Sequence, residues 1–165
     1  MATTLTTAFL EELKMETIST RKCLERIPES TFGFKPHPKS MEMGYLVQLV
    51  AAIPSWITHM IKDSEIDFAT FPQPKIETTS DIMTYFEANI KEAEETLRNT
   101  TDEDLEGDFS LKRNGEVLYT TQKKVDIGTT LNHWVHHRGQ LTVYMRLNDI
   151  LVPSIYGPSA DEKGF

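Results

Sequence analysis

The chain has 165 residues, of which 39% are hydrophobic, and its formal net charge at pH 7 is -8. This length supports one hydrophobic core and is too short for two, so we predict a single domain over residues 1–165. Nucleic acids bind mainly to clustered Lys and Arg side chains, whereas the basic residues here are scattered along an acidic chain. The sequence therefore predicts no nucleic-acid partner.

Several features bear on the cellular compartment. The N-terminus has no basic segment followed by an apolar one, which argues against a secretion signal. A single cysteine, Cys23, excludes an internal disulfide and fits a reducing compartment, so we expect a cytoplasmic protein with Cys23 buried. The most apolar stretch, Gly44–Ile61, approaches the length of a membrane span, but Pro54 and several polar residues interrupt it. We expect a buried bundle helix there and no membrane contact.

Two helices are expected in the first 62 residues. Apolar residues recur at three- and four-residue spacing over Thr7–Ile27, which predicts an amphipathic helix. The Pro- and Ser-rich segment that follows ends this helix, and Ser40 is the expected N-cap of the next one. The second helix should cover Met41–Lys62, with Pro54 kinking or interrupting it because proline lacks the N–H that a helix requires.

Two further helices are expected in the second half. One should start at Ser80 or Asp81 and end near Arg98, and the other should start between Lys123 and Thr130 and end near Asn148. Between them, two short alternating runs flank Asn114-Gly115, a dipeptide that favours a hairpin turn. The Pro- and Gly-rich tail either packs on the helices or stays mobile. We predict an all-α four-helix bundle with a small hairpin or irregular excursion between helices three and four.

The segment "LNHWVHHRGQL" holds three of the five histidines. His133 and His137 are four residues apart, so they project from one helix face and can reach a common metal ion. His136 is turned about 100° away, toward the outer surface. Gln140 and Tyr144 follow on the next turns of the same edge and are candidates for lining a pocket. The pair is either a metal-binding site or a polar seam in which the imidazoles satisfy backbone groups and water.

Three stretches, "IPESTFGFKPHPKSM", "LNHWVHHRGQLTVYMRL" and "VPSIYGPSADE", together resemble the DinB-like (DinB/YfiT) proteins. The resemblance extends over nearly the whole chain and is weakest between Asp63 and Lys123. It implies a four-helix bundle of up-down-down-up direction, commonly dimeric, that carries a divalent metal ion such as zinc or nickel on three histidines. We therefore expect a homodimer.

Two of the ligands that the resemblance implies fall on His133 and His137. The third belongs to a pattern of the form G-x-L-x-x-H followed by a proline and a tryptophan, and the corresponding stretch here reads "GYLVQLVAAIPSW". In this register the ligand position is occupied by Leu49, which has no lone pair to donate. Gln48 is adjacent but rotated by about 100°, and His59 lies about 15 Å further along the helix.

These residues leave two functional hypotheses. In the first, the resemblance to metal-dependent thiol (S-)transferases implies an enzyme in which His133 and His137 hold the metal and Gln48 or a thiol substrate completes its coordination. Tyr144 would then donate a hydrogen bond to the small-molecule substrate, although a structural role is the alternative. In the second hypothesis, Leu49 marks a metal-free, non-catalytic binding or structural module, and Arg138 pairs with an acidic residue or a carbonyl. No catalytic residue is assigned.

The two tryptophans complete the set of candidate residues. Trp56 and Trp134 lie on apolar helix faces and are interpreted as core or dimer-interface residues. Stacking against a bound ligand is the alternative role for either of them.

Overall fold

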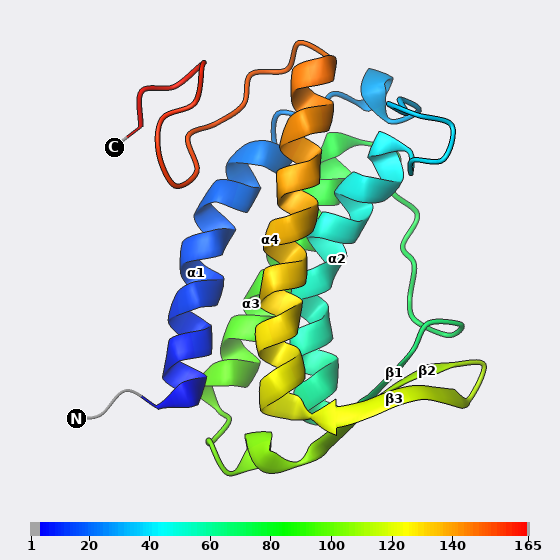
Figure 1. Cartoon of the computed structure of the whole chain (residues 1–165), viewed down its shortest axis with the longest axis vertical. Coiled ribbons are helices and arrows are strands. Elements are labelled where there is room, and N and C mark those ends of the chain that lie inside the picture. The colour runs from blue at the N-terminus through cyan, green and yellow to red at the C-terminus, as the bar shows by residue number, and fades with distance from the viewer. Residues whose placement is uncertain (1–3, 165) are drawn as a thin grey trace.

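The computed structural model describes residues 4–164 and contains a bundle of four long helices with a small sheet at one end (Figure 1). The helices are α1 (Leu5–Leu24), α2 (Met43–Lys62), α3 (Thr79–Arg98) and α4 (Lys123–Leu147). Figure 1 shows α1 and α4 running in one direction and α2 and α3 in the other, the up-down-down-up arrangement that the family resemblance implies. Since α2 and α3 are parallel, the chain between them has to return along the whole bundle.

The bundle is not purely α-helical, which corrects the predicted fold class. Three strands, β1 (Glu65–Asp67), β2 (Asp108–Arg113) and β3 (Glu116–Gln122), form a sheet in which β1 is parallel to β2 and β2 antiparallel to β3. The predicted hairpin is confirmed, and its turn residues Asn114 and Gly115 have φ angles of 52° and 79°. The Asp67 carboxylate accepts hydrogen bonds from both turn amides, at 3.0 and 2.6 Å, so β1 fixes the tip of the hairpin.

Helix α2 begins later than expected, and the prediction of Ser40 as its N-cap is wrong. The helix starts at Met43, whose backbone N–H donates to the carbonyl of Phe34 at 2.9 Å. The N–H of Gly44 donates to the carbonyl of Phe32 at 2.8 Å, and a Cβ atom on Gly44 would lie 3.0 Å from the Phe32 side chain. The preceding loop therefore supplies the acceptors that a side-chain cap would otherwise provide.

Helix α2 continues through Pro54, so the predicted interruption does not occur. Proline has no N–H to donate to the carbonyl of Val50, one helical turn earlier. The indole Nε1–H of Trp134 on α4 donates to that carbonyl at 2.8 Å. The side-chain amide of Asn89 on α3 donates to the next carbonyl, that of Ala51, at 2.9 Å. Both neighbouring helices are thus hydrogen-bonded to the backbone of α2 near the proline.

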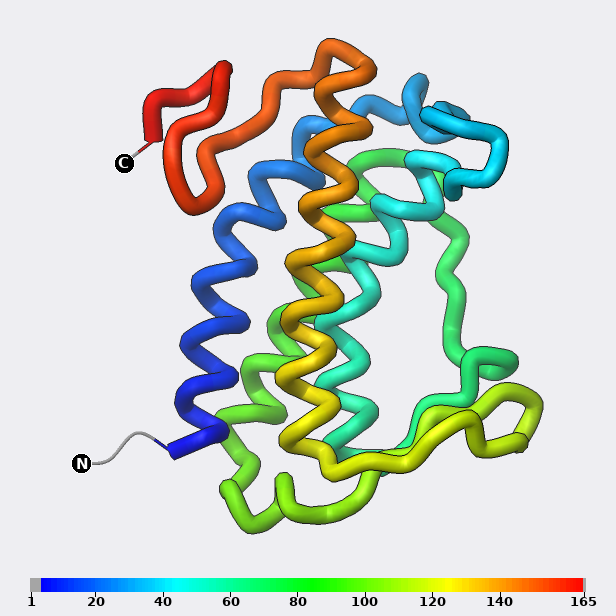
Figure 2. The backbone as a smooth tube through the Cα atoms, in the orientation of Figure 1, coloured from blue at the N-terminus to red at the C-terminus, as the bar shows by residue number. Residues whose placement is uncertain are grey.

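The tail after α4 packs against the bundle beside the C-terminal end of α1 (Figure 2). The predicted pairing of Arg138 is confirmed, because its guanidinium forms a buried ion pair of 2.5 Å with Glu16 of α1. The hydroxyl of Tyr156 in the tail lies 2.9 Å from both Glu16 carboxylate oxygens and accepts a hydrogen bond from Arg138 at 2.8 Å. A second ion pair, of 2.5 Å, joins Arg26 to Glu162.

The core is continuous between the four helices and includes Cys23, which is fully buried as predicted. Burial raises the pKa of the Cys23 thiol to about 11, so the thiolate is not populated at neutral pH. By length and composition alone, α2 is the one described helix that would suit a membrane span, with a mean hydropathy of 1.3 over the relevant window. It instead packs between α3 and α4.

Candidate functional site

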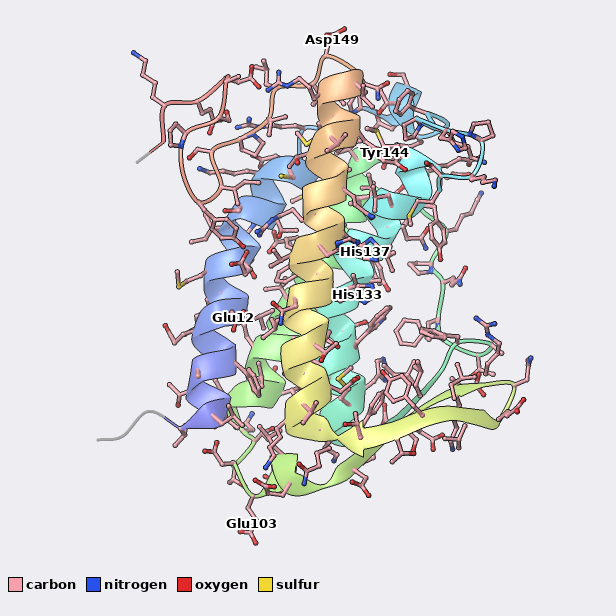
Figure 3. All side chains as sticks on the ribbon, viewed as in Figure 1. Glu12, Glu103, His133, His137, Tyr144 and Asp149 are labelled. Atoms are coloured by element: carbon pink, nitrogen blue, oxygen red, sulfur yellow. The ribbon has the colours of Figure 1, made fainter. Side chains whose placement is uncertain are left out.

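His133 and His137 lie on the side of α4 that faces α2, and both side chains are half-buried (Figure 3). Their ring centroids are 4.5 Å apart, as expected for residues one helical turn apart. Both imidazoles line a cavity of about 450 Å³ between α2, α4, α3 and the loop that follows β1. The lining residues are Met41, Tyr45, Gln48, Leu49, Ala52, Trp56, Phe68, Phe71, Pro72, Gln73, Tyr85, Arg113, His133 and His137. We call this cavity the outer pocket.

The surroundings of both imidazoles favour their neutral form. Burial lowers the pKa of His133 below its usual value of 6.5, and the neighbouring His137 and His136 lower it further. Burial also lowers the pKa of His137, against the opposing effect of a hydrogen bond to Gln140. In that bond the Nδ1–H of His137 donates to Gln140 Oε1 at 2.8 Å, which leaves the Nε2 lone pair of His137 available. The arrangement can accept a proton or a hydrogen bond from a molecule in the pocket.

The facing part of α2 presents a hydrocarbon side chain at the expected third ligand position. Leu49 is half-buried and lines the outer pocket together with His133 and His137. Gln48 also lines it, but its amide nitrogen donates to the carbonyl of Pro74 at 3.1 Å, which fixes the side chain against the loop. His59 does not line the pocket, and its Nδ1 lies 2.6 Å from Asp63 Oδ2.

The donor set around the two histidines does not fit a resident metal ion. A structural or catalytic zinc site needs at least three protein ligands, and the position opposite His133 and His137 is occupied by Leu49. Within residues 4–164, no group of three or more His, Cys, Asp or Glu side chains is arranged to hold a metal. An aliphatic group in this place also makes the pocket drier, which increases the cost of an incompletely coordinated divalent ion.

Aromatic rings form much of the remaining wall. Trp56 packs edge to face against His133, Phe68 and Phe71, with ring centroids 5.5, 6.0 and 6.4 Å apart. Trp56 packs against the core and also lines the pocket, whereas Trp134 is buried in the core as expected. The buried Nε1–H of Trp56 has no acceptor in the described part of the chain.

Two of the predicted pocket residues lie elsewhere. Gln140 does not line the outer pocket, but its Oε1 accepts a hydrogen bond from the Nδ1–H of His137. Tyr144 is buried, its hydroxyl donates to the carbonyl of Met41 at 3.1 Å, and its ring packs against Phe34. Neither side chain is among the residues that line the outer pocket in this structure. The alternative structural role for Tyr144 agrees with these contacts.

The loop and hairpin residues of the site were missed by the sequence analysis. Phe68, Phe71 and Arg113 reach the pocket from the segment after β1 and from the end of β2. The two phenylalanines in "DFATFPQP" are the signal in the sequence, since large apolar residues in a Pro-rich loop need a surface to pack on.

The pocket is free of acidic side chains although the chain contains 25 Asp and Glu residues. Of the described residues that line it, Arg113 is the one with a permanent charge, and no ion pair within residues 4–164 engages its guanidinium. Arg113 therefore supplies a positive charge to the pocket lining, and His137 supplies an acceptor at Nε2.

Two solved structures have the same fold. A DinB-like protein from Bacillus cereus ATCC 10987 is 25% identical with a TM-score of 0.73, and the match covers 94% of this chain and all of that one. A DinB-like protein, YjoA, from Bacillus subtilis is 20% identical with a TM-score of 0.71, and the match covers 88% of this chain and 96% of the other.

Sequence comparison extends the likeness to the family level. A segment of 32 residues is 53% identical to the uncharacterized protein YrdA of Bacillus subtilis (strain 168), and it spans 19% of that relative's length. The sequence model of the DinB family matches residues 1–163, in agreement with the resemblance noted from the sequence. The chain therefore belongs to the DinB family.

Proposed function

We propose that this protein binds a small, largely apolar organic molecule in the outer pocket without a resident metal ion. Aromatic and aliphatic side chains would enclose the body of the ligand, and His133 and His137 would hydrogen-bond to it as neutral imidazoles. Such a lining, with few polar groups, is typical of small-molecule sites. This is the metal-free binding module of the two functions considered from the sequence.

One observation carries this proposal. Leu49 lines the same cavity as His133 and His137, at the position where the family pattern places the third histidine. Where the family pattern has a histidine that can coordinate a metal, this chain has the hydrocarbon side chain of Leu49. The pocket therefore loses a coordination site and gains apolar contact area for an organic ligand.

A metal-dependent transferase that resembles the thiol (S-)transferases is the second candidate. It is favoured by the geometry of the imidazole pair, whose rings are 4.5 Å apart and in which His137 keeps a free Nε2 lone pair. In that case His133 and His137 would hold zinc or nickel, and a thiol substrate would complete the coordination. A metal held there would lower the pKa of a bound thiol or water.

Metal content separates the two candidates. Protein purified without a histidine tag is analysed by elemental mass spectrometry, alongside Leu49→His and His133→Ala. We expect less than a tenth of a metal ion per chain in the parent and about one in Leu49→His. Near-stoichiometric metal in the parent that disappears in His133→Ala would reject the metal-free proposal and favour the transferase.

Binding of an organic ligand needs its own measurement. The probe is 1-anilinonaphthalene-8-sulfonate, an aromatic anion whose fluorescence rises in an apolar site. We expect saturable binding that is weakened about tenfold by Arg113→Gln. Arg98→Gln, the same change of charge on an exposed arginine of α3 outside the pocket, is the matched control. Binding that is unaffected by Arg113→Gln would place the dye elsewhere and count against the pocket.

We also propose that the chain forms a homodimer. Exposed apolar side chains on α1 and α4, including Met15, Ile18, Val143 and Leu147, support it, because a helix face of this kind is typical of an interface. Light scattering coupled to size-exclusion chromatography tests it, and a mass of one chain at micromolar concentration would refute it.

A further inference from the structure

A second cavity adjoins the outer pocket and belongs to neither functional hypothesis. Its volume is about 300 Å³, and it lies between α2, α4 and the sheet. Trp56, Phe68 and His133 line both cavities, so the two spaces meet at these three side chains. The other lining residues are Met60, Ile66, Phe109, Leu111, Tyr119, Asp126, Thr129 and Thr130. We call this space the inner cavity.

Asp126 is the one carboxylate that lines the inner cavity, and it is only 6% exposed. Its Oδ1 accepts a hydrogen bond of 3.0 Å from the hydroxyl of Tyr119. Neither Lys nor Arg lines the cavity, and within residues 4–164 no ion pair includes Asp126. A buried carboxylate normally has a cationic partner, whereas the charge of Asp126 is offset only by the Tyr119 hydroxyl and by its position in the first turn of α4.

The electrostatics of this pair agree with that description. Burial raises the pKa of Asp126, and the hydrogen bond from Tyr119 offsets this only in part. Burial and the nearby Asp126 charge raise the pKa of Tyr119 to about 12, so the phenol stays a donor. Any cation that entered the cavity would lower the free energy of the ionised carboxylate.

Four aromatic side chains line the inner cavity together with Asp126. Trp56, Phe68, Phe109 and Tyr119 all line the inner cavity, and the Phe109 and Tyr119 rings are 6.5 Å apart at 70°. Aromatic faces attract cations through their quadrupole, most strongly where water is excluded. A cavity that is lined by several aromatic rings and one carboxylate without a cationic partner has the groups that bind an organic ammonium ion.

We propose that the inner cavity binds the ammonium group of an organic ligand, with Asp126 as its counter-ion and the surrounding rings as cation–π partners. This inference rests on the proposed function, because the rest of such a ligand would occupy the outer pocket beyond Trp56 and His133. The outer pocket has Arg113 and no carboxylate, so it does not compete for the cation. The charges of the two cavities would therefore orient the bound ligand, with its ammonium group toward Asp126.

The probe for this site is choline, and its uncharged isostere 3,3-dimethyl-1-butanol is the matched ligand control. Binding is followed by protein-observed NMR on the full-length protein. We expect choline to bind about tenfold more tightly than the neutral alcohol, and Asp126→Asn to remove that preference. Asparagine keeps the size of the side chain and an oxygen that accepts from Tyr119, so the fold should be retained.

Asp108→Asn, the same change of charge on an exposed aspartate of β2 that does not line the inner cavity, is the matched protein control. We expect its choline affinity to stay within about threefold of the parent. Equal binding of choline and the alcohol to the parent, or a preference that survives Asp126→Asn, would overturn the proposal. If the anilinonaphthalene sulfonate probe still binds through Arg113 in that event, the outer pocket stands and only the ammonium site is rejected.

Discussion

The hydrogen bond between Trp134 and α2 leads to a quantitative prediction. Pro54 deprives the carbonyl of Val50 of its helical donor, and the indole Nε1–H of Trp134 replaces that donor at 2.8 Å. Trp134→Phe removes the indole N–H and leaves a buried carbonyl without a partner. We expect a loss of about 2–4 kcal/mol in the free energy of unfolding, from the hydrogen bond, the unsatisfied carbonyl and the smaller ring.

A double-mutant cycle with Pro54→Ala isolates the hydrogen-bond contribution. Alanine restores an N–H at position 54, which can donate to the Val50 carbonyl as in an ordinary helix. The cost of Trp134→Phe should therefore fall by about 1–2 kcal/mol in the Pro54→Ala background. The loss of packing is the same in both backgrounds and cancels in the cycle.

The assay is urea unfolding followed by circular dichroism for the parent, both single variants and the double variant. Trp56→Phe is the matched control, because the Trp56 Nε1–H has no acceptor within residues 4–164 and its removal costs no hydrogen bond. Additive effects within about 0.5 kcal/mol would refute the compensation of Pro54 by Trp134.

Three further predictions concern the stability of the fold. Asp102 accepts hydrogen bonds from the N–H groups of Leu5 and Thr6, which lower its pKa, so its stabilising effect is present above the unfolded pKa and is lost as pH falls through the folded pKa. Asp102→Asn should lower the melting temperature at pH 7, and the difference in melting temperature between parent and variant should become smaller in acid. Thermal scans from pH 7 to 2 measure this difference, and a difference that grows in acid would contradict the prediction. Arg138→Met leaves the buried Glu16 carboxylate unpaired and should destabilise by about 3–5 kcal/mol in urea unfolding, whereas an unchanged midpoint would deny the pair a structural role. Glu16→Gln combined with Arg138→Met should recover part of that loss, because no uncompensated charge remains buried, and a double variant no more stable than Arg138→Met would exclude this explanation.

Local patterns in the sequence account for the parts of the fold that were predicted. The four helices follow from apolar spacing, and the hairpin follows from Asn114-Gly115, whose positive φ angles the turn requires. Strand β1 has three residues and no alternation long enough to detect, since its pairing with β2 is a contact across 45 residues of sequence. Helix α2 starts at Met43 and not at the predicted Met41, because its first N–H groups donate to the backbone carbonyls of Phe34 and Phe32. Local spacing does not reveal these contacts with the preceding loop.

In the candidate site too, local patterns predict some residues, and tertiary contacts determine the others. His133 and His137 were placed on one face by helical periodicity, and their facing Leu49 followed from the register of the family pattern. Gln140 and Tyr144 share that edge of α4, but partners from the same helix and from the loop before α2 hold them outside the pocket. The aromatic wall and the inner cavity depend on how the β1 loop and the hairpin close over α2, which no local pattern specifies.

The chemistry of the site is decided by the residue opposite the histidines more than by the histidines themselves. Burial keeps both imidazoles neutral, which is the state that coordinates a metal and also the state that hydrogen-bonds to an organic ligand. Their retention therefore does not distinguish the two functions. Leu49 does distinguish them, because a hydrocarbon group can contact an organic ligand but cannot coordinate a metal ion. The Asp126 carboxylate of the adjoining inner cavity supplies a negative charge that a metal site on the histidines does not require. Under the proposed function, the pocket would select its ligand by shape and by the sign of charge at each end.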